Sequence, residues 1–444
     1  MDPIILRAWL RLPRLALLLL AGVCQTVAFG QRTSGRSNSL SDSLPPPHAT
    51  KSSMNFSNVQ GWEGGRTPKA PEGFTVVPYA TGFDNPRWLY VMPNGDVLVA
   101  ESNTYHPWWE KLGAHFIGAS KSNSMRNSAD RITLLRDTDH DGMPDTRETF
   151  LDGLNQPFGM LVLGKWFYVA NTDALLRYPY EPGQTHIEKS KAEKVVDLPA
   201  GKVNRHWTRN IIANKEGTKI FIAVGSGSNI AEKGIDKELL RAAILEINPD
   251  GSDLRVYASG LRNPVGMDWA VGTSTLWTSV NERDELGDDL VPDYLTHVEE
   301  GAFYGWPYVY HGQHRDDRVK LLHPAQVKDT KVPDVDLGSH TASLGLAFYG
   351  EDVFPIKYRE GAFIAQHGSW NRSQLSGYRV VFVPFEKGKP TGKPEEFLGG
   401  FIAELDKEKV YGRPVGVVVT PAGALLVTDD VSNTLWKVSY GKGN

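Results

Sequence analysis

The sequence predicts an all-β fold, a six-bladed β-propeller with four antiparallel strands in each blade. First, one phrase recurs six times: a turn that often reads Asn-Pro, a short apolar strand, a glycine turn and a second strand. Second, 44 glycines and 28 prolines suit many strands joined by tight turns. Third, long helical periodicity is almost absent. A pair of β-sandwiches is the alternative, but radial repetition explains six equivalent phrases better.

The six copies justify the strands in order. Each copy consists of a turn phrase and the later strand to which it leads. The pairs of ranges are 82–87 and 95–100, 153–159 and 166–170, 205–207 and 219–224, 260–266 and 275–278, 343–347 and 361–365, and 412–416 and 424–428. The third copy is degenerate. A spacing of roughly 50 to 80 residues fits a four-stranded blade with its loops. Only 231–245 could hold a helix or an inserted loop.

The N-terminus predicts export to the periplasm or secretion. Three arginines precede the apolar run 15–23, and small residues at positions 28 and 30 mark a cleavage site. We therefore expect a signal peptide over 1–30, with retention as an uncleaved anchor as the alternative. The apolar run is too short for a comfortable membrane span. Residues 31–70 are rich in Ser and Pro and predict a disordered tether, and the propeller is expected over 71–442.

Charge and cysteine content exclude several classes of function. The net charge is −4, without the basic stripe of a nucleic-acid-binding protein. The single cysteine, Cys24, lies within the predicted signal peptide. The mature chain would then contain no thiol, which excludes disulfides and covalent c-type haem. A redox enzyme of this composition would hold its cofactor non-covalently and pass its electrons to an external acceptor.

One acidic loop has the full spacing of a calcium-binding loop. Acids stand at loop positions 1, 3, 5, 9 and 12, with glycine at position 6; they are Asp137, Asp139, Asp141, Asp145 and Glu148. The flanks 132–135 and 149–151 are predicted strands, not the paired helices of a calcium sensor, so we expect a structural calcium ion. The alternative is a charged turn without an ion. A second acidic cluster, 281–290, does not differ in its spacing from a solvated loop.

Several phrases carry a resemblance to a known family. Gly-Leu-Arg-Asn-Pro-Val-Gly at 260–266, the acidic loop after it and Tyr-Gly-Trp-Pro at 304–307 resemble the soluble pyrroloquinoline quinone (PQQ)-dependent glucose/aldose dehydrogenases. The phrases at 85–88, 139–142 and 367–372 look more like the sorbosone dehydrogenase branch. The resemblance covers roughly the whole predicted domain. It implies a quinoprotein that binds PQQ and calcium and oxidises a sugar or sugar aldehyde, such as an aldose or sorbosone, with a quinone or cytochrome as electron acceptor.

The resemblance also implies roles for individual residues. His206 matches the general base that takes the substrate hydroxyl proton as hydride moves to the quinone. Arg262 and Asn263 match a pair that contacts the quinone, where a guanidinium stabilises developing charge. Asp284 and Glu285 match positions that bind the cofactor calcium. The further cofactor-binding candidates are Arg372, Arg283 and His367, with Arg87 and Arg413 as weaker ones.

Two positions depart from the family pattern. Arg283 stands where the family has a glutamine, and Gly350 stands where it has a lysine. His367 is a candidate for either a second base or a cofactor contact. Two other functions stay open at this point: a calcium-dependent lactonase or hydrolase, and a non-catalytic propeller that binds carbohydrate or a protein partner.

Overall fold

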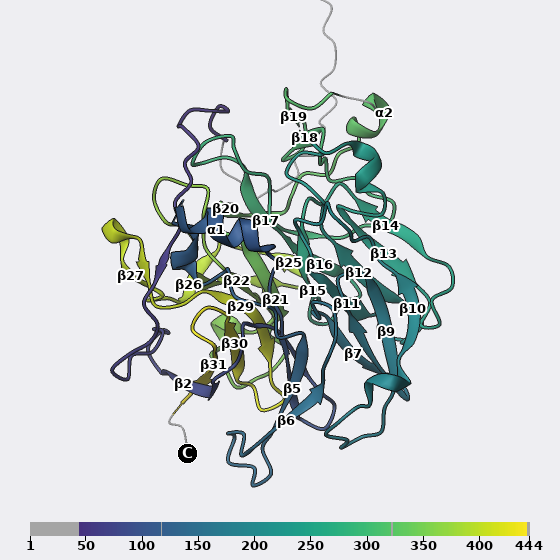
Figure 1. The fold of residues 1–444 in the computed structure, drawn as a ribbon, viewed down its shortest axis with the longest axis vertical. Coiled ribbons are helices and arrows are strands. Elements are labelled where there is room, and N and C mark those ends of the chain that lie inside the picture. Colours follow the sequence, from purple (N-terminus) through teal and green to yellow (C-terminus); the bar gives the residue numbers. More distant parts are fainter. Residues whose placement is uncertain (1–43, 117, 321–322, 442–444) are drawn as a thin grey trace, which may run out of the picture. The chain divides into compact units, whose positions relative to one another are not determined.

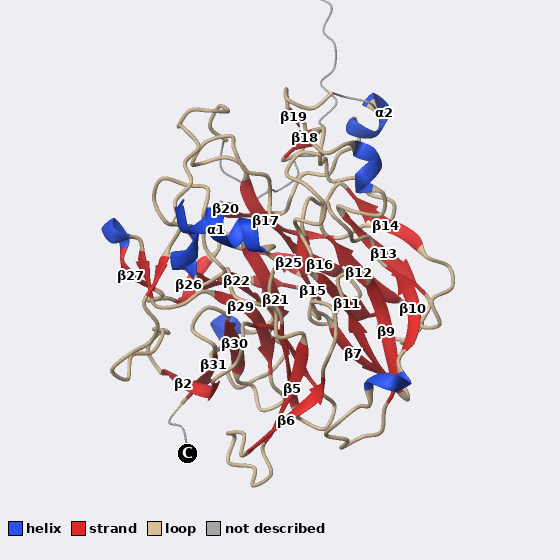
Figure 2. Ribbon diagram, viewed as in Figure 1, coloured by secondary structure: helices blue, strands red, loops and turns tan. Residues whose placement is uncertain are grey.

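Strands dominate the computed structural model, which describes residues 44–116, 118–320 and 323–441 (Figures 1 and 2). The predicted signal peptide and Cys24 lie outside these residues. The described chain confirms the all-β prediction and the four-stranded antiparallel sheets. None of the helices in these ranges is long and apolar enough to cross a membrane.

Six four-stranded antiparallel sheets form the body of the described chain, each built mostly from consecutive strands. The first three contain β3 (Pro86–Val91), β4 (Val97–Glu101), β5 (Arg131–Arg136) and β6 (Thr146–Leu151); β7 (Met160–Leu163), β8 (Trp166–Ala170), β9 (Ala174–Pro179) and β10 (Glu193–Asp197); and β11 (Arg209–Ala213), β12 (Ile220–Val224), β13 (Ala243–Ile247) and β14 (Arg255–Ser259).

The last three sheets each contain three consecutive strands and a fourth strand from elsewhere in the chain. They contain β15 (Pro264–Trp269), β16 (Leu276–Val280), β17 (Pro292–His297) and β20 (Val335–Ser339); β21 (Ser343–Phe348), β22 (Ala362–Gln366), β23 (Arg379–Val383) and β26 (Glu395–Leu398); and β29 (Pro414–Val419), β30 (Leu425–Asp429), β31 (Thr434–Tyr440) and β2 (Phe74–Thr81). Strand β2 comes from the N-terminal side of the chain and completes the sheet of the C-terminal strands. The six sequence copies coincide with the first two strands of the six sheets.

The first strands of the sheets contact one another in a closed series. β3 contacts β7, β7 contacts β11, β11 contacts β15, β15 contacts β21, β21 contacts β29, and β29 contacts β3. In Figure 1, the labels of β11, β15, β21 and β29 lie near the middle of the view, and the outer strands β10, β14, β20 and β2 lie toward its edges. We call these first strands the inner strands.

A separate hydrophobic cluster lies between each pair of neighbouring sheets. The six clusters include Leu98 with Phe167, Tyr168 with Ile222, Phe221 with Met267, Trp277 with Phe348, Phe363 with Trp436, and Leu426 with Leu89. Because each sheet packs on both faces, strands such as β4, β12 and β22 are buried along their whole length. This explains why their sequences are continuous apolar runs rather than alternating ones.

Glycine in the recurring phrase allows the inner strands to approach one another closely. A Cβ atom on Gly345 would overlap the carbonyl oxygen of Val415 in the next inner strand, and one on Gly159 would overlap the backbone of β11. Gly266 is in similar contact with β21. The recurring glycine therefore reflects packing between neighbouring sheets.

Smaller elements extend from the six sheets. They are the strands β1 (Asn58–Val59), β18 (Val309–Tyr310), β19 (His314–Arg315), β24 (Phe385–Glu386), β25 (Lys389–Pro390), β27 (Ile402–Glu404) and β28 (Lys409–Val410), and the helices α1 (Trp108–Phe116) and α2 (Pro324–Val327). The sequence did not predict α1. The stretch 231–245 contains a short 3₁₀ helix, Ile235–Glu238, and the start of β13.

The segment 44–70 differs from the disordered tether that its composition predicts. Strand β1 pairs in parallel with β28, Trp62 packs edge-on against Trp436, and Ser57 is buried. A few aromatic side chains among the polar residues suffice to hold the segment, because each one meets an aromatic partner on the domain.

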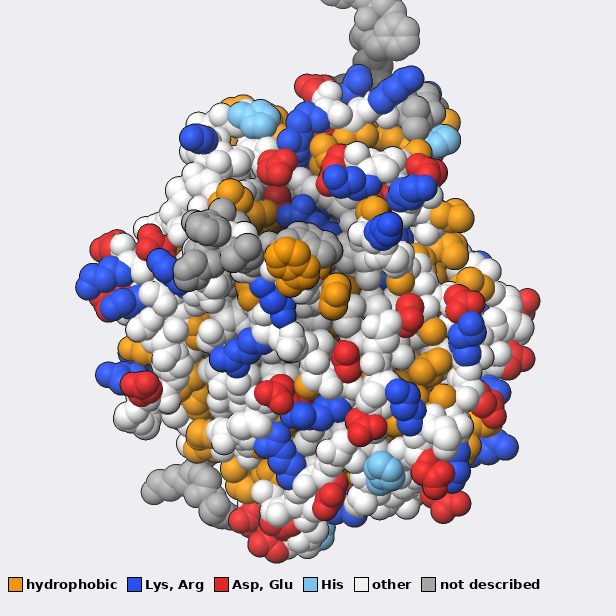
Figure 3. All heavy atoms as spheres, viewed as in Figure 1, with side chains coloured by type: hydrophobic (Ala, Val, Ile, Leu, Met, Phe, Trp, Pro, Cys, Tyr) orange, Lys and Arg blue, Asp and Glu red, His pale blue; other side chains and the backbone are white. Residues whose placement is uncertain are grey.

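The face of the molecule in Figure 3 carries both signs of charge, interspersed over its surface. This distribution agrees with the small net charge of −4, and the face shown lacks the continuous basic stripe of a nucleic-acid-binding protein.

Candidate active site

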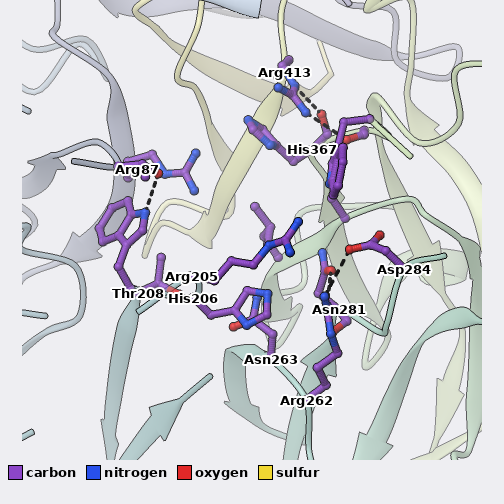
Figure 4. A pocket seen from close by; sticks show the side chains of 16 residues that line it. Arg87, Arg205, His206, Thr208, Arg262, Asn263, Asn281, Asp284, His367 and Arg413 are labelled. Carbon is purple, nitrogen blue, oxygen red and sulfur yellow. Dashed lines mark hydrogen bonds and ion pairs between the residues drawn. The ribbon is translucent and has the colours of Figure 1, made fainter. Parts of the chain in front are cut away.

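A cavity of about 260 Å³ lies where the inner strands begin (Figure 4). In an antiparallel pair the start of the first strand and the end of the second meet at the same edge. The loops beside the strands β3, β11, β15, β21 and β29 therefore converge on the cavity. They supply Arg87, Thr104, Arg205, His206, Trp207, Thr208, Arg262, Asn263, Asn281, Asp284, Ala342, Leu344, His367, Gly368, Trp370 and Arg413.

His206 has a defined tautomer. Its Nδ1 lies 2.9 Å from the carbonyl oxygen of Ser226 and 3.0 Å from the Ser226 hydroxyl, which donates to the Ser228 carbonyl at 2.7 Å. A carbonyl oxygen only accepts, so Nδ1 carries the proton. The neutral ring then has its lone pair on Nε2, the position that a general base requires.

The surroundings of His206 keep it neutral. Burial, together with the positive charges of Arg262 and Arg205, lowers the pKa of His206 well below 6.5. Gly225 packs between His206 and Asn263, where a Cβ atom would overlap both side chains. His206 is therefore positioned on a rigid wall as an unprotonated imidazole at neutral pH.

Arg262 is almost fully buried, and each edge of its guanidinium has a protein partner. Nε donates to the carbonyl of Asn229 at 3.2 Å, and Nη1 donates to the carbonyls of Glu282 at 2.6 Å and Asn281 at 3.2 Å. Nη2 donates to the Asn229 side chain at 2.9 Å and to Asp284 at 3.2 Å. Arg262 thus organises the loops around the cavity and adds positive charge to its wall.

Asn263 has an open hydrogen-bonding group. Its Oδ1 is buried and has no hydrogen-bond partner in the described part of the chain, and the same is true of Arg87 Nε. Because both residues line the cavity, a bound ligand would give these atoms partners that the protein itself does not supply.

The opposite wall of the cavity carries His367 and Arg413 (Figure 4) and is built around the buried carboxylate of Asp430. His367 Nε2 lies 2.9 Å and 3.1 Å from the two oxygens of Asp430, which also pairs with Arg87. Arg413 donates to the carbonyls of His367 and Gly368, each at 2.9 Å. Burial and Arg413 lower the pKa of His367 to about 4, although Asp430 opposes them. A second neutral imidazole therefore faces His206 across the cavity.

The cavity is cationic. Four arginines line it, whereas its one acidic lining residue is Asp284. Burial by itself raises the pKa of Asp284, but the contacts with His340 and Arg262 outweigh burial and lower it. The tryptophans at positions 207 and 370 add flat aromatic faces. This arrangement suits a planar ligand that carries several negative charges.

Three of the predicted site residues lie elsewhere. Arg283 is buried in an ion pair with Asp316 and donates to the carbonyl of Asp284 at 2.7 Å. Arg372 donates to the carbonyl of Asp288 at 2.7 Å and pairs with Asp289 at 2.9 Å. Glu285 has a positive φ of 74°, which turns its side chain toward Arg318, 3.1 Å away. None of the three lines the cavity, and other loop residues engage their charges, so their contact with the cofactor or its calcium stays a prediction.

The predicted calcium loop is the hairpin turn between β5 and β6. Carboxylate oxygens of Asp137, Asp139 and Asp145 lie within 4.8 Å of one another. Glu148 is exposed within β6, and neither it nor Asp141 belongs to this group of three. The group holds three of the five acids that the spacing selected, and its residues do not line the cavity.

Sequence reasoning missed four residues around the cavity: Arg205, Trp207, Trp370 and Asp430. Arg205 and Trp207 flank His206, and Trp370 lies three positions after His367, so a search of the sequence around these two histidines would have found them. Asp430 could not be found in this way, since 63 positions separate it from His367.

Comparisons of sequence place the chain among related proteins. A family model described as a domain of unknown function (DUF7133) matches residues 70–435. An uncharacterized protein of Borreliella burgdorferi is 28% identical over 390 residues, 85% of this chain and 92% of that protein. A pyrroloquinoline quinone-dependent pyranose dehydrogenase of Coprinopsis cinerea is 23% identical over 431 residues, 84% of this chain and 54% of that protein. The chain thus spans about half the length of the Coprinopsis relative.

Solved structures show the same fold. The holo form of the PQQ domain of pyranose dehydrogenase from Coprinopsis cinerea superposes with a TM-score of 0.68 at 19% identity, over 86% of this chain and 99% of that one. A calcium structure of a carbohydrate-active enzyme of family AA12 from Trichoderma reesei also has a TM-score of 0.68, at 16% identity over 86% and 99% of the two chains. The six sheets therefore have the propeller-like arrangement of PQQ-dependent sugar dehydrogenases.

Proposed function

The chain belongs to the family described as a domain of unknown function (DUF7133), and we propose that it is a PQQ-dependent dehydrogenase that oxidises a sugar or sugar aldehyde. One observation carries the proposal: a neutral His206 with its free Nε2 shares a cavity with four arginines. The proposal takes the six sheets as the six blades of a propeller, since the inner strands contact one another in a closed series.

The cavity residues fit PQQ, a planar quinone with three carboxylates. Arg87 and Arg413 retain guanidinium N–H groups that have no hydrogen-bond partner in the described part of the chain, and these groups would bind carboxylates. The Arg87 Cζ lies 5.6 Å from the centroid of the Trp207 ring. The buried Asn263 Oδ1 has no hydrogen-bond donor in the described part of the chain, so a ligand could supply one. When bound, PQQ accepts a hydride from the substrate carbon.

His206 is the proposed general base. Its Nε2 takes the proton of the substrate hydroxyl, while the Nδ1–H bond to Ser226 holds the ring in place. The nearby charges of Arg262 and Arg205 disfavour the imidazolium form, so the proton is readily passed on. Arg262 keeps the loops in register and stabilises negative charge in the cavity.

The predicted calcium ligands of the cavity do not assemble. Asp284 is already paired with Arg262 and His340, and Glu285 points to Arg318. We therefore assign no step to a calcium ion in the cavity. Calcium is proposed instead for the β5–β6 hairpin, where three carboxylates converge. The proposed substrate is a sugar, and the proposed electron acceptor is an external quinone or cytochrome. The protein is proposed to be exported.

The test is reconstitution of the purified protein with PQQ and calcium. We expect PQQ to quench tryptophan fluorescence at micromolar concentration and a dye-linked assay to detect oxidation of aldoses or sugar aldehydes. His206→Ala should bind PQQ as before but turn over about 10²- to 10⁴-fold more slowly, because only the proton transfer is lost. The matched control is His186→Ala, at an exposed position outside the cavity. Failure of PQQ to bind would reject the proposal, and full turnover by His206→Ala would reject the role of the base.

A further inference from the structure

Arg205 differs from the other three arginines of the cavity. Arg87 pairs with Asp430, Arg413 donates to two backbone carbonyls, and Arg262 has a partner at every edge. The exposed Arg205 guanidinium, in contrast, makes no hydrogen bond or ion pair with any residue that the structure describes. Figure 4 shows its side chain reaching into the middle of the cavity, between the walls of His206 and His367.

An aromatic stack supports the Arg205 side chain. Its Cζ lies 5.3 Å from the centroid of the Trp370 ring. Trp370 is in turn stacked with Phe56: their ring centroids are 6.2 Å apart and the angle between the ring planes is 16°. Contact with an aromatic face fixes a guanidinium without using its N–H groups. The planar edge of Arg205 is thereby presented to the cavity with its donors free.

The segment that carries Phe56 connects two loops of the cavity wall. Asn55 N–H donates to the carbonyl of Trp370 at 2.8 Å. On the other side, His48 N–H donates to the carbonyl of Leu286 at 2.7 Å, and Thr50 Oγ1 accepts from the N–H of Asp288 at 2.7 Å. The segment therefore holds the Trp370 loop and the loop that follows Asp284 in one fixed arrangement.

We propose that Arg205 is a carboxylate-binding residue of this cavity, supported by Trp370 and, through it, by Phe56. A free, planar guanidinium forms paired charge-assisted hydrogen bonds with a carboxylate. Two ligands of the proposed function offer this group: the PQQ cofactor and a sugar acid as substrate. The inference depends on the proposed function for the identity of the ligand, but not for the chemistry of the site.

The first experiment uses a redox-inert probe, so that its result does not depend on PQQ chemistry. Benzene-1,2,4-tricarboxylate is planar and carries three carboxylates, and its binding to the whole protein is measured by calorimetry. We expect Arg205→Gln to weaken binding about 10- to 100-fold, because a charge-assisted pair is lost. The control is Arg66→Gln: Arg66 also lies over an aromatic ring, that of Tyr411 at 5.7 Å, but does not line the cavity. Equal binding by both variants, or no binding to the unaltered protein, would overturn the inference.

Two further measurements then identify the source of the carboxylate. If Arg205→Gln also weakens PQQ binding about 10-fold or more, Arg205 holds the cofactor. If PQQ binding is unchanged but kcat/KM falls for glucuronate and not for glucose, Arg205 binds a sugar-acid substrate. A protein that binds the tricarboxylate through Arg205 but never binds PQQ would reject the proposed function alone.

The supporting role of Phe56 has its own variant. Phe56→Leu retains an apolar side chain but removes the aromatic ring that stacks with Trp370. We expect a smaller loss of tricarboxylate affinity than in Arg205→Gln, together with a shift in tryptophan emission because Trp370 loses its stacking partner. Unchanged affinity and emission would show that Phe56 does not position Trp370.

Discussion

His206 and His367 are both neutral imidazoles, but different partners orient them. The Nδ1–H of His206 points to a backbone carbonyl, which leaves Nε2 as a base. The Nε2 of His367 instead points to the carboxylate of Asp430, so Nε2 is engaged by the protein itself. Arginines lie near both rings, and their positive charges help to keep the imidazoles unprotonated.

The low pKa of His367 predicts how stability depends on pH. In the unfolded chain its pKa is near 6.5, and in the folded protein it is about 4. Between these values the unfolded chain binds a proton that the folded protein does not bind. The contribution of His367 to stability is therefore present above pH 6.5 and is lost as the pH falls toward about 4.

His367→Asn removes this titration. We expect its thermal midpoint to fall less between pH 7 and pH 4.5 than that of the unaltered protein, whatever its midpoint at pH 7. Because each protein is compared with itself at the two pH values, the stability lost with the Asp430 contact does not affect the comparison. His186→Asn, at an exposed position, is the control. An equal fall in His367→Asn and the unaltered protein would contradict a buried neutral imidazole.

At the scale of elements, the β5–β6 hairpin shows how an acidic turn folds. Asp137 accepts from the N–H of Gly142 at 2.8 Å, and Asp145 accepts from the N–H of Thr138 at 2.8 Å. These bonds shape the turn, and the hydroxyl and backbone N–H of Thr138 lower the pKa of Asp145. A second oxygen of Asp137 is buried and has no hydrogen-bond partner in the described chain. The turn therefore has an oxygen available for an ion.

Asp137→Asn tests the proposed calcium site. In chelator-treated protein, about 1 mM calcium should raise the thermal midpoint of the unaltered chain by a few degrees, because an ion bound to the folded state stabilises it. The variant should show much less of this increase, since it lacks one charged ligand. Asp250→Asn changes an exposed acid in the turn between β13 and β14 and is the control. An equal calcium response in all three proteins would contradict the site.

At the scale of the whole molecule, strand β2 joins the two ends of the domain. It pairs with β31 from Phe74 to Thr81. Phe74 lies 4.8 to 5.5 Å from the rings of Phe354, Tyr358, Phe397 and Tyr440 in edge-on contacts. The last sheet is thus complete only when the N-terminal strand has joined the C-terminal ones.

Phe74→Ala should weaken this closure. We expect the free energy of unfolding to fall by about 2–4 kcal/mol, somewhat less than for a fully buried phenylalanine because Phe74 is partly exposed. Chemical denaturation measures the change. Val256→Ala truncates an exposed side chain on another outer strand, β14, and should have little effect. Similar values for both variants would show that β2 contributes little to closure.

The sequence predicted much of the fold because local patterns determine strands. Each copy of the phrase around Asn-Pro and Gly marked the first two strands of a sheet, and the acids from Asp137 to Glu148 marked a hairpin between strands. Short apolar runs bounded by turns are a local signal. The β2–β31 pairing has no such signal, since it joins residues more than 350 positions apart.

The candidate site shows the same contrast between what local sequence predicts and what tertiary structure decides. Sequence by itself determined the strand pattern, and it pointed to His206, Arg262, Asn263, Arg87 and His367, all of which the fold brings to one cavity. Tertiary structure alone decided which charges remain available to a ligand. Arg283 and Arg372 look as suitable as Arg205 in the sequence, yet Asp316 and Asp289 engage the first two. The physical reason is that a charge takes its partner from whichever loop lies nearest, and only the packing of the six sheets determines that.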